Sequence, residues 1–296
     1  MKSQLRRFLV IAAASALVLI AALAAFVLWG PIPVSDKRVM LDFMLGRGID
    51  PPSTTTVAER LAAPAGMRVQ VYSADVPLAR VMLFTPDGDL IVSRTRAGVV
   101  TLLERDRNAD GIADGHRVLF ENLDGPHGLA LHDGWLYVAE RTAIRRVRFD
   151  ATTGTTSGSL EPVLTGLTTD GFHQTKTIGI GPDGWLYLAH GSSCNACVEK
   201  DPRRATMMRL RPDGSGAEIY ATGLRNSVGF DWAPWDGALY ATDNGRDLLG
   251  DDFPPDELNR IEQGRFYGWP YVNGFGIADP DLGGAYAGDP VPTHPV

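Results

Sequence analysis

The sequence predicts an all-β protein, a β-propeller of the six-bladed type that is incomplete here, with an N-terminal transmembrane helix. Three observations predict this fold. Gly and Pro account for 33 and 20 of the 296 residues, which suits a chain with many tight turns. A unit of strand, Asp-Gly turn and strand occurs four times, and one long apolar run stands near the N-terminus.

The composition excludes several classes of protein. Apolar residues make up 44% and charged residues 21% of the chain, which excludes global disorder, collagen and a coiled coil. The net charge is −7, and three of the 28 basic residues lie in the first seven positions. A nucleic-acid partner needs clustered positive charge, so none is expected. Two cysteines are too few for a disulfide scaffold.

The apolar run covers residues 8–29, and Ser15 is its only polar side chain. At about 1.5 Å per residue it crosses the roughly 30 Å hydrocarbon layer. Positive charges precede it, which predicts a cytoplasmic N-terminus and an exported remainder. We therefore expect residues 1–29 to anchor the chain in the inner membrane, with the main domain in the periplasm. The alternative is a cleaved signal peptide, in which case the protein is secreted.

Residues 30–66 are predicted to form a linker or peripheral arm, because four prolines and a Ser-Thr run interrupt any long element. One short helix is possible around Val57–Ala63.

Residues 67–296 carry the repeat. Its four copies are VMLFTPDGDLIVS (81–93), GLALHDGWLYVAE (128–140), IGIGPDGWLYLAH (178–190) and GFDWAPWDGALYAT (229–242). Their Asp-Gly turns begin at 87, 133, 183 and 236, so the spacings are 46, 50 and 53 residues. A period of about 40–50 residues is typical of a propeller blade, and a β-sandwich is the alternative. The segment accommodates four to five blades, so the C-terminal blades are expected to be missing.

One acidic motif has the spacing of a calcium loop. Oxygen-bearing side chains stand at its positions 1, 3, 5 and 9, and Gly111 stands at position 6; the predicted ligands are Asp106, Asn108, Asp110, Asp114 and the carbonyl of Ile112. Position 12 is Arg117 rather than Glu, so this is not a full EF-hand. We expect a structural calcium ion here, and an acidic turn is the alternative.

Cys194 and Cys197 form a C-x-x-C motif. Val198 replaces the His that c-type haem attachment requires, no second ligand pair for zinc follows, and no βαβ unit suggests a thioredoxin-like site. A short disulfide loop is the favoured interpretation in an exported chain.

Two polar groups precede the inner strands of successive blades. His173 comes before the third repeat, and Arg225 and Asn226 come before the fourth. Loops at this position open on the mouth of a propeller channel. A histidine there can accept a proton near neutral pH, and a guanidinium with an amide can bind a carboxylate. The alternatives are a solvated histidine and an arginine paired with a neighbouring blade.

Three segments together resemble the glucose/sorbosone dehydrogenase family, the soluble pyrroloquinoline quinone (PQQ) sugar dehydrogenases. They are HQTKTIGIGPDGWLYLAHG (173–191), TGLRNSVGFDW (222–232) and DELNRIEQGRFYGWP (256–270). The stretches SSCNAC and LGDDFPPDEL look most like the L-sorbosone dehydrogenase branch.

The resemblance implies a six-bladed propeller that holds PQQ and calcium at the channel mouth. It implies that His173 is the catalytic base, that Arg225 and Asn226 contact the quinone, and that the backbone carbonyls of Gly245 and Arg246 bind the calcium ion. This chain has Asp-Asn-Gly-Arg where many relatives have Glu-x-Gly-Pro, a change that a carbonyl ligand tolerates.

The implied activity is periplasmic oxidation of an aldose or sorbosone-like sugar by hydride transfer to the quinone. The implied partners are the sugar, a periplasmic or membrane electron acceptor, and the membrane through the N-terminal helix. Two alternatives remain: a non-catalytic propeller that binds a protein or glycan, and a calcium-dependent lactonase.

Overall fold

The computed structural model describes residues 14–15, 17–26, 45 and 53–296, and the statements below concern these residues. The chain divides into two compact units, Met1–Val69 and Gln70–Val296, which are described separately.

In the first unit, residues 14–15 and 17–26 are helical, and helix α3 covers Thr54–Arg60. Helix α3 begins three residues before the predicted Val57, because the Ser53 side chain caps it by accepting a hydrogen bond from the Thr56 amide at 3.1 Å. Within the described residues, no helix combines the length and apolar character needed to cross a bilayer. The span predicted at residues 8–29 lies partly outside the described residues.

The second unit is built from antiparallel sheets. The first contains β1 (Val81–Phe84), β2 (Leu90–Arg94), β3 (Val99–Glu104) and β4 (Gly115–Phe120). The second contains β5 (Leu129–His132), β6 (Trp135–Ala139), β7 (Ala143–Asp150) and β8 (Thr155–Thr165). The third contains β9 (Lys176–Ile180), β10 (Leu186–His190), β11 (Thr206–Leu210) and β12 (Glu218–Thr222). The fourth contains β13 (Gly229–Trp232), β14 (Leu239–Asp243) and β15 (Glu257–Ile261).

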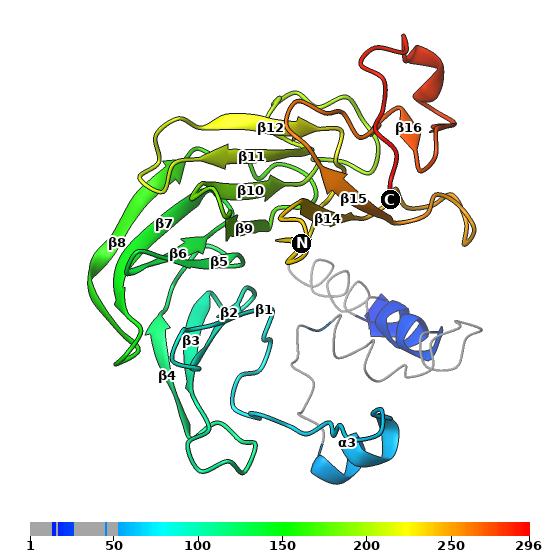
Figure 1. Ribbon diagram of the computed structural model, residues 1–296. Helices are drawn as coiled ribbons and strands as arrows, with labels where there is room; N and C mark the ends of the chain where they lie inside the picture. Colours follow the sequence, from blue (N-terminus) through cyan, green and yellow to red (C-terminus); the bar gives the residue numbers. More distant parts are fainter. Residues whose placement is uncertain (1–13, 16, 27–44, 46–52) are drawn as a thin grey trace, which may run out of the picture. The chain divides into compact units, whose positions relative to one another are not determined.

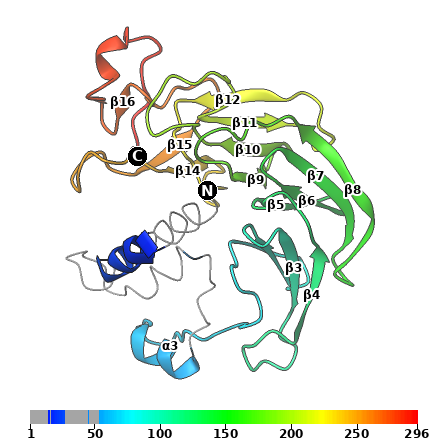
Figure 2. The same cartoon turned by 180° about the vertical axis from the view of Figure 1, so that it is seen from behind.

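These sheets are four blades of a β-propeller. In each sheet the strands follow one another in chain order, and the first strands β1, β5, β9 and β13 lie next to one another. Figures 1 and 2 show the sheets succeeding one another along an open arc. The all-β propeller is therefore confirmed with four blades. A six-bladed ring is not seen in the described residues: after β15 the chain forms only a small hairpin, β16 (Val272–Asn273) with β17 (Ile277–Ala278), and a 3₁₀ turn at Gly283–Ala285.

The core lies between the blades rather than inside each sheet. Strand β10 is buried along its whole length, and its alternate side chains point to opposite faces. Leu186 and Leu188 pack toward blade two with Tyr137 and Ile144, whereas Tyr187 and Ala189 pack toward blade four. A strand apolar on both faces therefore specifies a sheet that is covered on both sides, which is the condition of an inner blade.

The predicted Asp-Gly turns are confirmed. Gly184 has φ +76° and donates its N–H to the carbonyl of Gly181, and Gly88 has φ +92° and donates to Thr85. A residue other than Gly is strained in this left-handed region. The turns end β1 and β9 at the edge opposite to the one at which each blade begins.

The Tyr-Gly-Trp-Pro motif at residues 267–270 connects blades three and four. The amide of Tyr267 donates to the carbonyl of Thr222 in β12, and its hydroxyl donates to the carbonyl of Arg260 in β15 at 2.6 Å. The tyrosine is buried in the core between these blades. Its contacts are structural.

Candidate functional site

The predicted catalytic and quinone-contacting residues, His173, Arg225 and Asn226, lie at the edge where the chain enters each blade. Because every blade is an antiparallel meander, the loop before its first strand and the loop after its second strand meet at one edge. His173 precedes β9, Ser192 follows β10, and Arg225 and Asn226 precede β13. The propeller topology thus brings together groups that are 50 residues apart in sequence.

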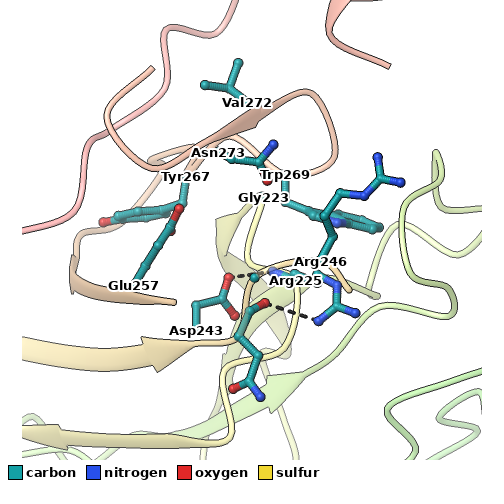
Figure 3. A pocket seen from close by; sticks show the side chains of 11 residues that line it. Gly223, Arg225, Asp243, Arg246, Glu257, Tyr267, Trp269, Val272 and Asn273 are labelled. Carbon is teal, nitrogen blue, oxygen red and sulfur yellow. Dashed lines mark hydrogen bonds between the residues drawn. The ribbon is translucent and has the colours of Figure 1, made fainter. Parts of the chain in front are cut away.

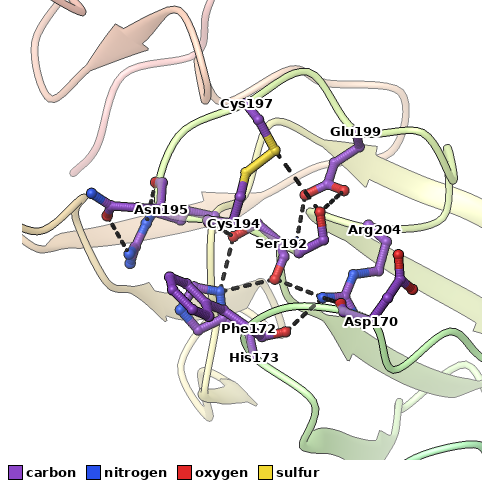
Figure 4. The surroundings of a disulfide bond; sticks show 11 residues. Asp170, Phe172, His173, Ser192, Cys194, Asn195, Cys197, Glu199 and Arg204 are labelled. Atoms are coloured by element: carbon purple, nitrogen blue, oxygen red, sulfur yellow. Dashed lines mark hydrogen bonds between the residues drawn. A yellow bond between two sulfur atoms is a disulfide. The ribbon is translucent and has the colours of Figure 1, made fainter.

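The imidazole of His173 is fixed through one ring nitrogen. Its Nδ1 lies 3.0 Å from the carbonyl oxygen of Ser192 and 2.9 Å from the hydroxyl of the same residue. The Ser192 hydroxyl donates to the carbonyl of Cys194 at 2.8 Å (Figure 4), so it can only accept from the ring. Both contacts assign the proton to Nδ1 and leave Nε2 as a proton acceptor.

The electrostatics of His173 favour the neutral ring. Burial is the largest cause that lowers its pKa to about 4, and the positive charges of Arg225 and Arg204 lower it further. The hydrogen bond that the ring donates to the backbone carbonyl of Ser192 and the negative charge of Asp247 act in the opposite direction. At neutral pH the imidazole is therefore uncharged, and its Nε2 is available as a base.

Asn226 and His173 both lie close to Gly191. A Cβ placed on Gly191 would stand 2.7 Å from the Cβ of His173 and 2.7 Å from the Oδ1 of Asn226. Gly191 therefore permits a close approach between the loops of blades three and four.

Arg225 is 3% exposed, and each of its three side-chain nitrogens donates a hydrogen bond. Its Nε donates to the carbonyl of Asn195 at 3.0 Å, and its Nη2 donates to the Oδ1 of Asn195 and to Asp247, both at 2.9 Å. Its Nη1 donates to the carbonyl of Asn244 at 3.3 Å (Figure 3). The guanidinium thus belongs to a network that spans blades three and four, and the predicted contact of Arg225 with a quinone stays a prediction.

Asp243, the last residue of β14, binds the loop at residues 225–227 through hydrogen bonds. Its carboxylate accepts from the amides of Arg225 at 2.8 Å and Asn226 at 2.6 Å and from the hydroxyl of Ser227 at 3.1 Å. Burial and the neighbouring Glu257 raise the pKa of Asp243 to about 7. Burial also raises the pKa of Glu257. A buried carboxylate paired with a half-buried one on the neighbouring strand favours either a proton or a cation.

Gly245 and Arg246 follow Asp243 and line a small cavity together with Glu257 and Asn273 (Figure 3). The cavity measures about 10 Å³, room for one water molecule or ion. Among the described residues, none donates a hydrogen bond to the carbonyl oxygens of Gly245 and Arg246. The Arg246 side chain turns away and pairs with Asp279 at 2.8 Å. The predicted carbonyl ligands are therefore free to accept, and their role stays a prediction.

The loop at residues 106–114 lies at the opposite edge of the propeller. The Arg105 side chain donates to the carbonyl of Asp87 in the turn after β1, at 2.6 Å. The loop oxygens accept from the loop's own amides: Asp106 from Gly111 at 2.6 Å, and Asp110 from Ile112 at 2.8 Å. In the described part of the chain, the carboxylates of this loop do not form a group of three within 4.8 Å. A calcium ion here is remote from His173 and stays a prediction.

Cys194 and Cys197 form a disulfide, as the favoured interpretation of the C-x-x-C motif predicts. Their sulfurs lie near Glu199, but bonded sulfurs are not thiolate ligands. The loop between them lies against the candidate site. No sequence pattern predicts a role for Asn195, Ser192 or Asp247, although Asn195 stands inside the conspicuous C-x-x-C motif.

Two buried basic side chains, Lys176 and Arg204, lie beside the site. Lys176, the first residue of β9, is fully buried, and its ammonium donates to the carbonyl of Gln174 at 2.7 Å. Burial and the nearby Arg204 lower the pKa of Lys176 to about 7. The Nε of Arg204 and the Nδ1 of His190 are buried without a hydrogen-bond partner in the described residues. Excess buried donors and positive charge suit an anionic ligand.

The four blades of this propeller thus carry a neutral histidine, an amide and an arginine at the edge where the chain enters each blade. Residues 61–274 match the TrAA12-like family, and the chain belongs to that family. The predicted relationship to the soluble sugar dehydrogenases is thereby confirmed at the level of the family, whereas the sorbosone branch stays a prediction.

Solved structures share the fold. The calcium structure of a Trichoderma reesei carbohydrate-active enzyme of family AA12 matches with TM-score 0.64 and 23% identity, over 77% of this chain and 65% of that one. The PQQ-bound aldose sugar dehydrogenase of Streptomyces coelicolor matches with TM-score 0.54 and 26% identity, over 69% of this chain and 66% of that one. This chain spans about two thirds of either structure.

A shorter match is closer in sequence. A stretch of 91 residues is 45% identical to an uncharacterized protein of Borreliella burgdorferi, and it covers 30% of this chain and 24% of that protein. Because that protein is uncharacterized, the match gives no information about activity.

Proposed function

We propose that this chain is a PQQ- and calcium-dependent oxidoreductase that oxidises the C1 hydroxyl of an aldose or sorbosone-like sugar. The observation that carries the proposal is the state of His173. Its Nδ1 is committed to Ser192, so Nε2 is left as the acceptor, and the ring lies in the positive field of Arg225 and Arg204. That arrangement suits proton removal from a hydroxyl group with stabilisation of the negative charge that develops.

The residues fit an anionic quinone. PQQ carries three carboxylates, and the buried positive charges of Arg204 and Arg225 act on His173, with the buried Lys176 next to Arg204. The unpartnered Nε of Arg204 supports the same assignment. When bound, PQQ supplies the electrophilic centre that accepts the hydride. The protein supplies the base, the orientation through Asn226 and the positive field.

The residues also fit calcium. The carbonyls of Gly245 and Arg246 are free, and the paired carboxylates of Asp243 and Glu257 lie at the same small cavity. Calcium prefers oxygen ligands, so this donor set suits it. The ion there would offset the negative charge that raises the pKa of Asp243. A second, structural calcium ion is proposed for the 106–114 loop.

We propose a periplasmic location for the main domain, with the N-terminal segment as its membrane anchor. The Cys194–Cys197 disulfide supports this, because disulfides persist in oxidising compartments. The electron acceptor is proposed to be a periplasmic or membrane carrier.

The test is reconstitution of the full chain with PQQ and calcium, followed by dye reduction with a panel of aldoses. We expect sugar-dependent reduction that falls by about 10² to 10⁴ in kcat in His173→Ala, the usual contribution of a general base. His116→Ala, a partly exposed histidine on β4, is the matched control and should keep full activity. Absence of PQQ binding would support a binding propeller, and lactone hydrolysis without PQQ would support a lactonase; either result overturns the proposal.

A further inference from the structure

The disulfide loop at residues 194–197 lies between the two halves of the proposed site (Figure 4). It follows β10 in blade three, and two adjacent residues at its start, Cys194 and Asn195, contact different functional groups. One contact leads to His173 and the other to Arg225 in blade four.

The contact with His173 runs through Ser192. The ring Nδ1 donates to the Ser192 hydroxyl, which in turn donates to the carbonyl of Cys194 at 2.8 Å. A carbonyl that belongs to a bonded cysteine cannot move without the loop. The orientation of the imidazole therefore depends on the position of Cys194.

The contact with Arg225 is made by Asn195, through its backbone carbonyl and its side-chain amide. Its carbonyl accepts from Nε and its Oδ1 from Nη2, at 3.0 and 2.9 Å. The same Oδ1 accepts from the amide of Asp247 at 2.8 Å, and Nδ2 donates to the Asp247 carbonyl at 3.0 Å. Asp247 in turn binds Arg225. An amide of this length supplies both the acceptor and the donor, whereas Asp lacks the donor.

The base of the loop is held independently. Both oxygens of Glu199 accept from Ser193, from its amide at 2.6 Å and its hydroxyl at 2.7 Å. The carbonyl of Ser193 accepts from the amide of Phe172, the neighbour of His173. The loop is therefore anchored to blade three. It reaches across to blade four through Asn195, and just before the loop the amide of Ser192 donates to the carbonyl of Arg225 at 2.7 Å.

We propose that the Cys194–Cys197 loop positions His173 and Arg225 relative to one another, with Asn195 as the positioning residue that holds the guanidinium. This inference deepens the proposed oxidoreductase function and rests on it for the catalytic consequence. The structural consequence concerns the protein without cofactor and can be measured separately.

The first experiment compares Asn195→Ala with wild type in the full chain. The readout is the pKa of His173 in the cofactor-free protein, measured by NMR titration of the imidazole. Loss of the Asn195 contacts lets Arg225 move and water reach the ring, and both changes raise that pKa. Arg225 and Arg204 lower it and Asp247 raises it, so these are the charges that face the ring. We expect a rise of at least one pH unit from about 4. Gln263→Ala, an exposed amide near the opposite edge, should leave it unchanged.

The second experiment opens the disulfide in the wild type with dithiothreitol. The chain has two cysteines, so reduction alters this bond alone. We expect the same rise in the pKa of His173, reversed on reoxidation, and this measurement decides the matter if Asn195→Ala does not fold. An unchanged pKa of His173 after reduction, or in a folded Asn195→Ala, overturns the positioning role.

The third readout is dye reduction by the protein loaded with PQQ and calcium. We expect kcat to fall by about tenfold or more in Asn195→Ala while KM changes less, since misplacement of the base by a fraction of an ångström affects the chemical step. If wild type shows no sugar oxidation, the proposed function is wrong, and the titrations still decide the positioning role. If activity is present and Asn195→Ala keeps the kcat of wild type, the catalytic consequence is wrong.

Discussion

Replacement of Asp243 by Asn tests the electrostatics beneath the Arg225 loop. The side chain is 5% exposed, and its carboxylate accepts three hydrogen bonds from residues 225–227. Burial and Glu257 raise its pKa from 3.8 to about 7. An Asn side chain keeps the shape, removes the charge and offers one acceptor oxygen in place of two.

Removal of the charge and loss of one acceptor oxygen change the unfolding free energy in opposite directions, and only the first effect depends on pH. Because the pKa is raised in the folded state, the contribution of Asp243 to the unfolding free energy of wild type is largest below pH 3.8 and is lost as the pH rises through 7. A rise of roughly three pH units corresponds to at most about 4 kcal/mol. The lost acceptor costs the variant about 1–3 kcal/mol at every pH.

Asp243→Asn should therefore be less stable than wild type at pH 4 and more stable at pH 8. Urea denaturation at both pH values measures the difference, in EDTA so that no cation neutralises the carboxylate pair. The difference between variant and wild type cancels the titration of the other groups. If that difference is the same at pH 4 and pH 8, the assignment of a raised pKa to Asp243 is refuted.

Three further predictions follow from packing and buried charge. Gly191→Ala places a Cβ 2.7 Å from His173 and Asn226, so it should lower kcat at least tenfold in dye reduction, whereas Gly284→Ala, with open space around it, should not. Lys176→Met should raise Tm more at pH 6 than at pH 9, because the lowered pKa of this lysine means that its charge is held at a cost below about pH 7; equal changes at both pH values would contradict this. Arg246→Met leaves the buried Asp279 carboxylate unpaired, which should destabilise the protein by about 3–5 kcal/mol in urea denaturation and speed proteolysis after residue 270, and cleavage at the wild-type rate would count against it.

Local signals made the propeller predictable. Each Asp-Gly pair fixes a turn through the left-handed glycine, as at Gly88 and Gly184, and the spacing of the pairs reveals the repeat. Alternation in the segment Leu186–His190 predicts a strand but leaves its environment open. The number of blades and the hairpin after β15 depend on long-range packing, so the predicted six-bladed type could not be obtained from these patterns.

The candidate site was predictable only in part. His173, Arg225 and Asn226 stand at the same position in successive repeats, so the period itself indicates that they share an edge. Asn195 gives no such signal, because its importance comes from contacts with residues 30 and 52 positions away. The spacing of the 106–114 motif predicted a metal site but not its location, which the Asp87 contact places at the opposite edge.

The sequence by itself determined the turns, the strands, the period and the residue types at the entry edge, because these depend on backbone preferences and on neighbours close in the chain. Only the tertiary structure decided which nitrogen of His173 carries the proton, what holds Arg225, and that Asp243 shares its buried environment with Glu257. Proton location and pKa depend on distance and burial, and these are set by groups that meet only when the blades pack.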